Sequence, residues 1–275
     1  MKQPRKHLLC LLLALLLTGV LLAGCAADTA DANADLPVIT IGCDNYPPFT
    51  YVNSDGKPVG IDVELADEAF RRMGYRPEFV TINWAEKNTL LENGVIDCIW
   101  SSFSMSGRAD EYTWAGPYMY SHQVVAVMPD SDIQTLADLA GKTVVVQATT
   151  KPESLFLDGN DPRIPEIRAL HSLQKRELIY SYLAKGYADA VAAHEISILQ
   201  FMKDYGFEFR ILEEPLEAVE LGVAFSRSDD RGIAQALSAT LEEMQADGTT
   251  RSILAGYLAA VSYTHLRAHE TRHDL

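Results

Sequence analysis

The chain has 275 residues, enough for two ordinary domains or one large one, and 48% of them are hydrophobic, as in a packed globular protein. Lysine and arginine total 23 against 38 for aspartate and glutamate, which gives a formal net charge of -15. So acidic a surface repels phosphate backbones and gains nothing from counterion release, and the composition therefore argues against a nucleic-acid partner.

Residues 1–24 have the pattern of a signal peptide, with three basic residues before an apolar core over residues 8–22. At about 15 residues, this core is short for a membrane span. It ends in LAGC, which resembles a bacterial lipobox. The resemblance implies cleavage before Cys25 and its acylation, for example with palmitate; secretion without lipid is the alternative. Residues 25–36 are small and acidic with no apolar period, which predicts a flexible spacer.

Strand and helix patterns alternate over the next part of the chain. β-rich or apolar runs predict strands, and amphipathic runs that end at glycine predict helices. We expect strands over 38–42, 78–82 and 96–100, helices over 62–73 and 85–94, and a short hairpin around a turn at 53–56. This alternation predicts a mostly parallel sheet with helices on both faces.

The run DCIWSSFSMSGR combines a buried strand with hydrogen-bonding residues. Residues 98–100 suit a strand covered on both faces, and Ser101, Ser102 and Ser104 follow where that strand should end, before Arg108. In open α/β sheets, ligands bind beyond the carboxyl ends of strands, so hydroxyls followed by an arginine fork are placed to hold a carboxylate. A serine-rich turn with a solvated arginine is the alternative.

The α/β alternation starts again after a predicted crossing between lobes, an apolar strand over residues 124–128. The further elements are helices over 133–139, 173–186 and 195–206, strands over 143–147, 166–170 and 188–193, and a loop over 148–154. A segment over 213–220 has no clear period, and a strand over 220–225 and an amphipathic helix over 231–245 then close the pattern.

Two α/β units with two extended crossings predict a two-lobed α/β protein with a ligand cleft between its lobes. The boundaries we expect are 37–123 with 219–260 for lobe 1 and 124–218 for lobe 2. Cys43 and Cys98 lie on separate predicted strands at positions too far apart for a disulfide, so we expect both to be buried and reduced.

Residues 261–275 differ in composition from the rest and contain three histidines at four-residue spacing, His265, His269 and His273. Such spacing could mimic a metal site on one helical face. The string resembles translated sequencing-adapter read-through, however, so we interpret it as a non-native tail. We expect no metal and no cofactor.

Residues 38–260 resemble the extracytoplasmic solute-binding proteins of ABC transporters, in the family that binds polar amino acids. The matching pieces are IGCDNYPPF, GKPVGIDVELA, the serine run ending in Arg108, WAGPY, DLAGKTVVVQ and DGTTRSILAGYL. The resemblance implies two lobes that close on a small-molecule ligand, with two crossing strands as the hinge. It also implies a permease partner, an extracytoplasmic location and a monomer without enzymatic activity.

The resemblance assigns site residues in both lobes. It places Asp44, Tyr46 and Trp84 on the wall of the first lobe, with Trp84 as an aromatic shelf or, alternatively, as plain core. Thr149 and Thr150 match a second-lobe loop that gives a hydroxyl and backbone amides to the ligand carboxylate, although the usual glycine is missing.

The family's carboxylate loop matches Ser101, Ser102, Ser104 and Arg108, although it usually has a threonine and one more residue before the arginine. The largest departure is at His194, which stands where the family has an acidic partner for the ligand ammonium. A neutral imidazole supplies no charge. Either the neighbouring Glu195 takes the ammonium or the ligand is not an ordinary amino acid, and Glu195 can equally be a helix-capping residue.

The leading hypothesis is a lipid-anchored receptor that captures an amino acid or a related small carboxylate for an ABC importer. One alternative is a dehydratase on the same fold, with Glu195 or His194 as acid or base. Another is a sensory module that acts through a membrane partner.

Overall fold

The computed structural model describes residues 35–258. The predicted signal peptide, Cys25, most of the spacer and the tail over residues 261–275 lie outside the described residues. Between residues 35 and 258, no helix is long and apolar enough to cross a membrane.

A nine-stranded mixed sheet organises the fold, with strand order β4-β1-β5-β11-β6-β9-β7-β8 and with β10 paired to β6. Its strands are β1 Val38–Cys43, β4 Arg76–Thr81, β5 Cys98–Ser104, β6 Thr113–Val127, β7 Thr143–Gln147, β8 Ala169–Leu173, β9 Ala190–His194, β10 Arg210–Ile211 and β11 Glu217–Phe225. A separate hairpin pairs β2 Tyr51–Val52 with β3 Pro58–Val59. The helices are α2 Ile61–Arg72, η1 Trp84–Glu86, α3 Lys87–Glu92, η2 Leu136–Leu139, α4 Lys151–Asp158, α5 Arg176–Ala184, α6 Glu195–Tyr205, α7 Ile233–Ala246 and α8 Thr249–Leu258.

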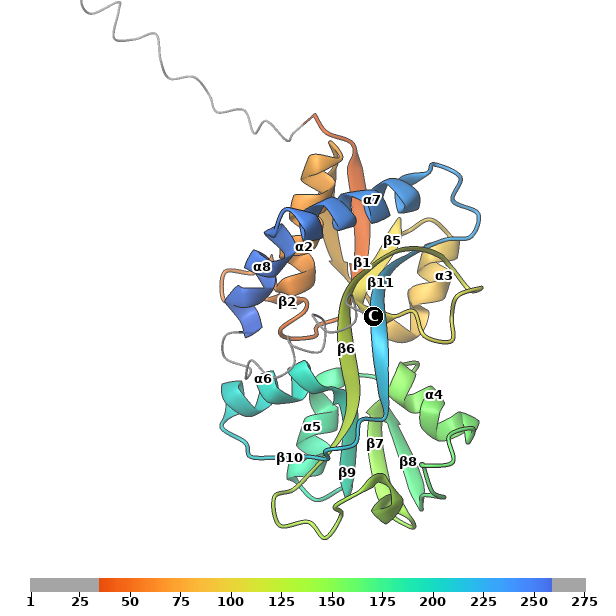
Figure 1. The fold of residues 1–275 in the computed structure, drawn as a ribbon, viewed down its shortest axis with the longest axis vertical. Coiled ribbons are helices and arrows are strands. Elements are labelled where there is room, and N and C mark those ends of the chain that lie inside the picture. The colour runs from red at the N-terminus through yellow and green to blue at the C-terminus, as the bar shows by residue number, and fades with distance from the viewer. Residues whose placement is uncertain (1–34, 259–275) are drawn as a thin grey trace, which may run out of the picture. The chain divides into compact units, whose positions relative to one another are not determined.

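Two parallel groups of strands are joined by one antiparallel pair. Strands β4, β1 and β5 run parallel, as do β8, β7 and β9. Between them, the long strands β6 and β11 pair with each other in antiparallel register, and Figure 1 shows them side by side between the two groups. The expected two α/β lobes with two crossing strands are therefore confirmed, but the sheet is mixed because both crossing strands are antiparallel to their neighbours.

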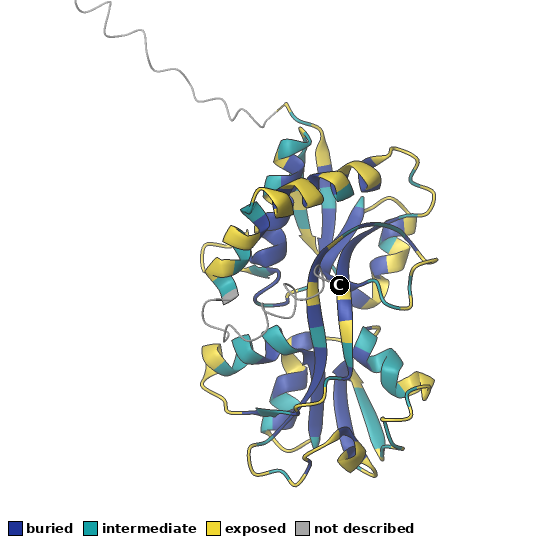
Figure 2. Cartoon of the chain, in the orientation of Figure 1, coloured by how far each residue is buried: buried dark blue, intermediate teal, exposed yellow. Residues whose placement is uncertain are grey.

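Each parallel group has its own hydrophobic core. One large cluster joins β1, α2, β5, the first part of β6, β11 and α7, with Trp100 and Phe70 at its centre. Two further clusters pack the last part of β6 against β7, β9, α5 and α6. Figure 2 shows these strands buried along most of their length, while α7 exposes its outer face.

The start of α2 shows how local sequence sets this packing. Gly60 precedes the helix with φ +127°, and a Cβ there would lie 2.3 Å from the carbonyl oxygen of Phe49, so only glycine fits. Asp62 and Glu64 occupy the first turn, and two arginines occupy the last turn, which matches the helix dipole. The turn is therefore placed tightly enough to bury Asp62 completely.

Two predicted boundaries near the crossing strands are wrong. The serines do not follow β5 as a loop, because the strand continues through Ser104 with all seven residues buried. The segment over residues 113–123, expected to lead into a strand at 124–128, belongs to one strand of 15 residues, β6. Both segments pair with β11, and β11 also begins earlier than expected, at Glu217. Long-range pairing that local sequence does not encode therefore sets these boundaries.

Three further expectations in the second lobe need correction. Residues 148–154 are not all loop, because α4 begins at Lys151 with a proline in its first turn, a start signal that the sequence carried. The strand expected over 166–170 lies at Ala169–Leu173, where its register with β7 places it. The helix expected over 133–139 is only the 3-10 helix η2.

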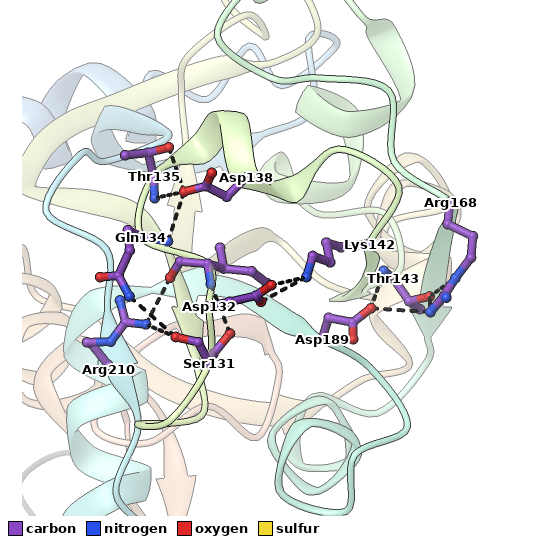
Figure 3. A network of polar contacts seen from close by, with 11 residues as sticks. Ser131, Asp132, Gln134, Thr135, Asp138, Lys142, Thr143, Arg168, Asp189 and Arg210 are labelled. Carbon is purple, nitrogen blue, oxygen red and sulfur yellow. Dashed lines mark hydrogen bonds and ion pairs between the residues drawn. The ribbon is translucent and has the colours of Figure 1, made fainter.

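A polar network fixes η2 and the turn before it. Figure 3 shows the Asp138 carboxylate accepting hydrogen bonds from the backbone nitrogens of Gln134 and Thr135, at 3.0 and 2.8 Å, and from the Thr135 hydroxyl. This capping box ends the preceding turn, so the helix cannot begin earlier. Nearby, Lys142 pairs with Asp132 at 2.8 Å.

Cys43 and Cys98 are free and buried, as the sequence predicted. They lie on the neighbouring parallel strands β1 and β5, and Cys98 is in register with Ile41. Burial raises the pKa of the Cys43 thiol to about 12. Both cysteines therefore behave as small, unreactive core residues.

Candidate ligand-binding site

A cavity lies where the ends of β5 and β9 meet the starts of α4 and α5. Its lining is polar and basic with three apolar residues, and consists of Trp84, Ser101, Ser102, Phe103, Ser104, Arg108, Gln123, Thr150, Lys151, Pro152, Arg176 and His194. Its volume is about 20 Å³.

The serines of β5 present hydroxyls to this cavity. The hydroxyls of Ser102 and Ser104 are buried and have no hydrogen-bond partner among the described residues, whereas Ser101 Oγ accepts a bond of 3.1 Å from the backbone of Asp44. Ser102 has φ +44°, a conformation unusual for a residue with a side chain. The buried carboxylate of Asp62 holds it there by accepting the Ser102 backbone N–H at 2.6 Å.

Arg108 follows these serines and lines the same cavity. Its Nη1 donates to the carbonyl oxygen of Ser104 at 3.2 Å, and its guanidinium carbon lies 5.2 Å from the centroid of the Phe103 ring. Burial lowers the pKa of Arg108, and no carboxylate of residues 35–258 forms an ion pair with it. The cavity therefore holds a half-buried cation with donors left over for an anion.

Only one of the two threonines predicted for the second lobe lines the cavity. Thr150 lines the cavity, and its hydroxyl donates to the carbonyl oxygen of Gln147 at 2.6 Å. Thr149 is exposed and is not among the lining residues. It has φ +58°, its N–H donates to Glu153, and its carbonyl oxygen and hydroxyl accept from Lys87 Nζ at 3.3 and 3.1 Å. Thr149 thus connects the two lobes beside the cavity.

The first-lobe residues Asp44 and Tyr46 lie behind the cavity lining. Tyr46 is fully buried, and its hydroxyl accepts the backbone N–H of His194 at 3.1 Å. Asp44 Oδ2 accepts a bond of 2.7 Å from the side-chain amide of Gln147 and lies 3.5 Å from Arg176 Nε. Both residues therefore support groups that reach the cavity.

Trp84 is part of the hydrophobic core and also lines the cavity. It belongs to a hydrophobic cluster in which its ring meets the edge of Phe103, with 5.3 Å between ring centroids. Its role as a shelf for a ligand stays a prediction.

His194 lines the cavity, and Glu195 does not. The His194 ring contacts Gln123 Nε2 at 2.8 Å and Ser121 Oγ at 2.9 Å, so both of its nitrogens are occupied. Burial, with the Arg176 charge as the next cause, lowers the pKa of His194 to about 3, so the imidazole is neutral. Glu195 begins α6 and lies 3.7 Å from His122 Nδ1, and this contact raises the pKa of His122.

Arg176, Gln123 and Lys151 are the polar lining residues that sequence reasoning missed. Arg176 is the first residue of α5, where a cation opposes the helix dipole. That misfit is the signal that could have indicated a role outside the helix. Gln123 lies inside β6, and Lys151 begins α4 and pairs with Glu217 at 3.2 Å.

Comparison with known proteins agrees with this architecture. Residues 39–260 match the family model of bacterial extracellular solute-binding proteins, family 3. A Vibrio harveyi protein named as an amino-acid ABC transporter-binding protein, PatH, is 31% identical over 86% of this chain and 93% of its own. The histidine-binding periplasmic protein of Salmonella typhimurium is 33% identical over 80% of this chain and 86% of its own.

Solved structures show the same fold. A protein solved with bound L-arginine superposes with a TM-score of 0.74 at 27% identity, covering 81% of this chain and 90% of that one. The chain is therefore a member of the bacterial extracellular solute-binding proteins, family 3.

Proposed function

We propose that this protein captures an amino acid or a related small carboxylate in the cavity beside Arg108 and delivers it to an ABC importer. The observation that carries the proposal is that a half-buried arginine without an ion-pair partner lies beside two buried serine hydroxyls that have no hydrogen-bond partner in the described part of the chain. A ligand carboxylate would satisfy all three groups at once.

The proposal includes motion of the lobes. The lining of the cavity comes from both sides of the β6 and β11 pair. The two strands would act as the hinge, with lobe 1 over 37–123 and 219–260 and lobe 2 over 124–218. Lys87 and Thr149 would then form part of the closed contact.

The proposed location is the outer side of the cell membrane, with the mature chain attached by lipid at Cys25 and acting as a monomer. Support comes from the LAGC sequence and from the family, whose members are extracellular by description. The predicted spacer over residues 25–36 would let the folded part of the chain reach a permease.

The dehydratase alternative lacks an acid or base in a suitable state. No carboxylate is among the lining residues of the described cavity, and the neutral His194 is held at both nitrogens. With its pKa near 3, His194 is a poor base at neutral pH. The sensory alternative would need a membrane partner, which the cavity geometry does not address.

A thermal-shift screen with the twenty amino acids and a set of small carboxylic acids tests the proposal. A ligand at one hundred times its Kd stabilises the folded state by about 2.7 kcal/mol, enough for a clear rise in melting temperature. We expect at least one compound to raise it, and Arg108→Ala to abolish the rise. If no compound does so, the protein does not capture a ligand of this class; turnover of a prephenate-like acid would support the enzyme instead.

A further inference from the structure

We propose that the ligand is a small dicarboxylate, with one carboxylate bound by Arg108 and the second by Arg176. This inference rests on the proposed function, because it assigns a ligand class to the same cavity. It goes further in two ways. Arg176, a residue of the second lobe, selects ligands with a second carboxylate, and the ligand does not need an ammonium group.

The lining of the cavity carries positive charge. Its lining includes three cations, Arg108, Lys151 and Arg176, and no carboxylate in the part of the chain that the structure describes. Lys151 is compensated by Glu217 at 3.2 Å, whereas Arg108 has no such partner within residues 35–258. A bound anion is therefore favoured, and a ligand with net positive charge is disfavoured.

Arg176 is a buried cation that lines the cavity and packs against Tyr46. It is 7% exposed, and its guanidinium carbon lies 3.3 Å from the centroid of the Tyr46 ring. Its Nε is buried and has no hydrogen-bond partner among residues 35–258. A buried guanidinium with unused donors is costly, and a carboxylate is the group that matches its planar fork.

Asp44 forms an ion pair with Arg176 through Nε, and the two Nη nitrogens of Arg176 make no ion pair or hydrogen bond to the described residues. Asp44 Oδ2 lies 3.5 Å from Arg176 Nε, and Nε makes no hydrogen bond to it. The same oxygen accepts from Gln147 at 2.7 Å, and Oδ1 accepts from the backbone of Asn45 at 2.9 Å. Asp44 is thus held by the protein behind the lining, and Arg176 keeps donors for a ligand.

The cavity also offers an ammonium group little. An ammonium has three donors and needs acceptors, preferably charged ones. The neutral His194 is already bonded at both nitrogens, and the lining acceptors without a partner in the described structure, Gln123 Oε1 and the Ser102 and Ser104 hydroxyls, are all uncharged. Arg176 would repel an ammonium placed beside it. An amino group on the ligand therefore contributes little affinity.

Arg108 and Arg176 come from opposite lobes, so two carboxylates on one ligand would join the lobes. Arg108 follows β5, and Arg176 begins α5 after β8. Because the two guanidinium groups reach the cavity from different lobes, a ligand with two anionic ends would contact both at once. This would make closure depend on the second carboxylate.

Calorimetric titration with matched ligands tests the proposal on the unmodified protein. Glutarate, L-glutamate and L-glutamine form one series; succinate, L-aspartate and L-asparagine form a shorter one. Replacing the second carboxylate by a carboxamide removes a buried charge pair and should raise Kd about 30-fold or more. Replacing the amino group by hydrogen should raise Kd less than about threefold, or lower it, because the amino group has no charged partner.

Two variants test whether Arg176 and His194 set this ligand preference. Arg176→Gln should raise Kd for the dicarboxylates about 30-fold or more and leave the amide ligands within about threefold. His194→Asp should restore a charged acceptor and so favour L-glutamate over glutarate about tenfold or more. Arg71→Gln makes the same side-chain change on exposed α2, far from the lining residues, and should change no Kd.

The outcomes separate this inference from the proposed function. If L-glutamine, L-histidine or L-arginine binds the parent more tightly than every dicarboxylate, the inference is overturned and the proposed function stands. Unchanged dicarboxylate binding by a folded Arg176→Gln variant also overturns it. If that variant does not fold by circular dichroism, the ligand series on the parent decides the question. Binding of no compound overturns both.

Discussion

The guanidinium carbon of Arg176 lies 3.3 Å from the centroid of the Tyr46 ring, so the two side chains stack in van der Waals contact. The same tyrosine accepts the backbone N–H of His194 through its hydroxyl, at 3.1 Å. One buried first-lobe residue therefore orients two second-lobe residues that line the cavity. The tyrosine ring therefore positions the guanidinium together with the Asp44 carboxylate, which lies 3.5 Å from Arg176 Nε.

Tyr46→Leu should weaken ligand binding, because it removes the aromatic face beneath Arg176. A desolvated cation–π contact is worth about 2 kcal/mol, so we expect Kd to rise about 10-fold or more in calorimetric titration. Tyr46→Phe keeps the ring and serves as the control, with a smaller change caused by loss of the hydroxyl contact to His194. Equal affinities of the leucine variant and the parent would show that the stack does not position the guanidinium.

Asp62→Asn should remove a pH dependence of stability. Burial raises the pKa of Asp62 to about 7 from an ordinary 3.8, so the folded protein binds a proton that the unfolded chain has released between these values. Stability from this group is therefore fully present below pH 3.8 and is lost as pH rises through 7. The shift corresponds to about 4 kcal/mol.

Urea unfolding of parent and Asp62→Asn from pH 4 to 7 measures this difference, because other titrating groups cancel between the two proteins. We expect the asparagine variant to gain stability relative to the parent as pH rises. Parallel stability curves across the range would show that Asp62 titrates normally and that the Ser102 conformation is held in another way.

Lys87→Met should reveal the opposite slope at higher pH. Burial, followed by the charge of Arg108, lowers the pKa of Lys87 to about 8 from 10.5, so the unfolded chain binds the extra proton between these values. The stability contribution is present above pH 10.5 and is lost as pH falls through 8, by about 3 kcal/mol in total. The parent should therefore gain stability relative to Lys87→Met from pH 8 to 10.5.

The same variant tests the contact between the lobes. Lys87 Nζ donates to the carbonyl oxygen and hydroxyl of Thr149, and its loss should raise the ligand Kd several-fold and speed release. Lys57→Met, on the exposed hairpin, is a matched control. A pH-independent difference in stability, together with unchanged release, would contradict both roles of Lys87.

The sequence predicts the architecture well because strands, helices and crossings leave local patterns. It also draws attention to Ser102, Ser104 and Arg108, which line the cavity, since hydroxyls and a cation after a buried strand are an unusual combination. Local patterns do not predict the boundaries of strands where long-range pairing sets them. Strand β5 continues through its serines because β11 pairs with them, and β8 lies three residues later than predicted because β7 sets its register.

The site is harder to predict than the fold because its residues come from distant segments. Arg176 and Gln123 reach the cavity only through the packing of α5 and β6, which no local pattern shows. The positive φ angles of Ser102 and Thr149 are likewise imposed by contacts with Asp62, Glu153 and neighbouring backbone. Residue types reveal what chemistry is present, whereas tertiary contacts decide which groups meet.

Cys25→Ala should abolish lipid attachment. The LAGC sequence at the end of an apolar core is the reason to expect acylation at this cysteine. Metabolic labelling with a fatty acid in a bacterial host measures the attachment, with Cys43→Ala as the control because that cysteine is buried in the body. Labelling that persists in Cys25→Ala would show that the protein is not anchored through this residue.

Calorimetric titration of Arg108→Ala with the compound that the screen finds shows whether Arg108 binds the ligand carboxylate. Removing one partner of a buried charge pair costs roughly 2–5 kcal/mol, so Kd should rise about 30-fold or more. Arg108→Lys should recover only part of the affinity, because an ammonium cannot reproduce the planar fork.

The exposed Arg71→Ala serves as the control, and circular dichroism confirms folding of each variant. We expect lost affinity in Arg108→Ala, partial recovery in Arg108→Lys and parent affinity in Arg71→Ala. A folded Arg108→Ala protein that binds the ligand as tightly as the parent would show that Arg108 does not bind the ligand carboxylate.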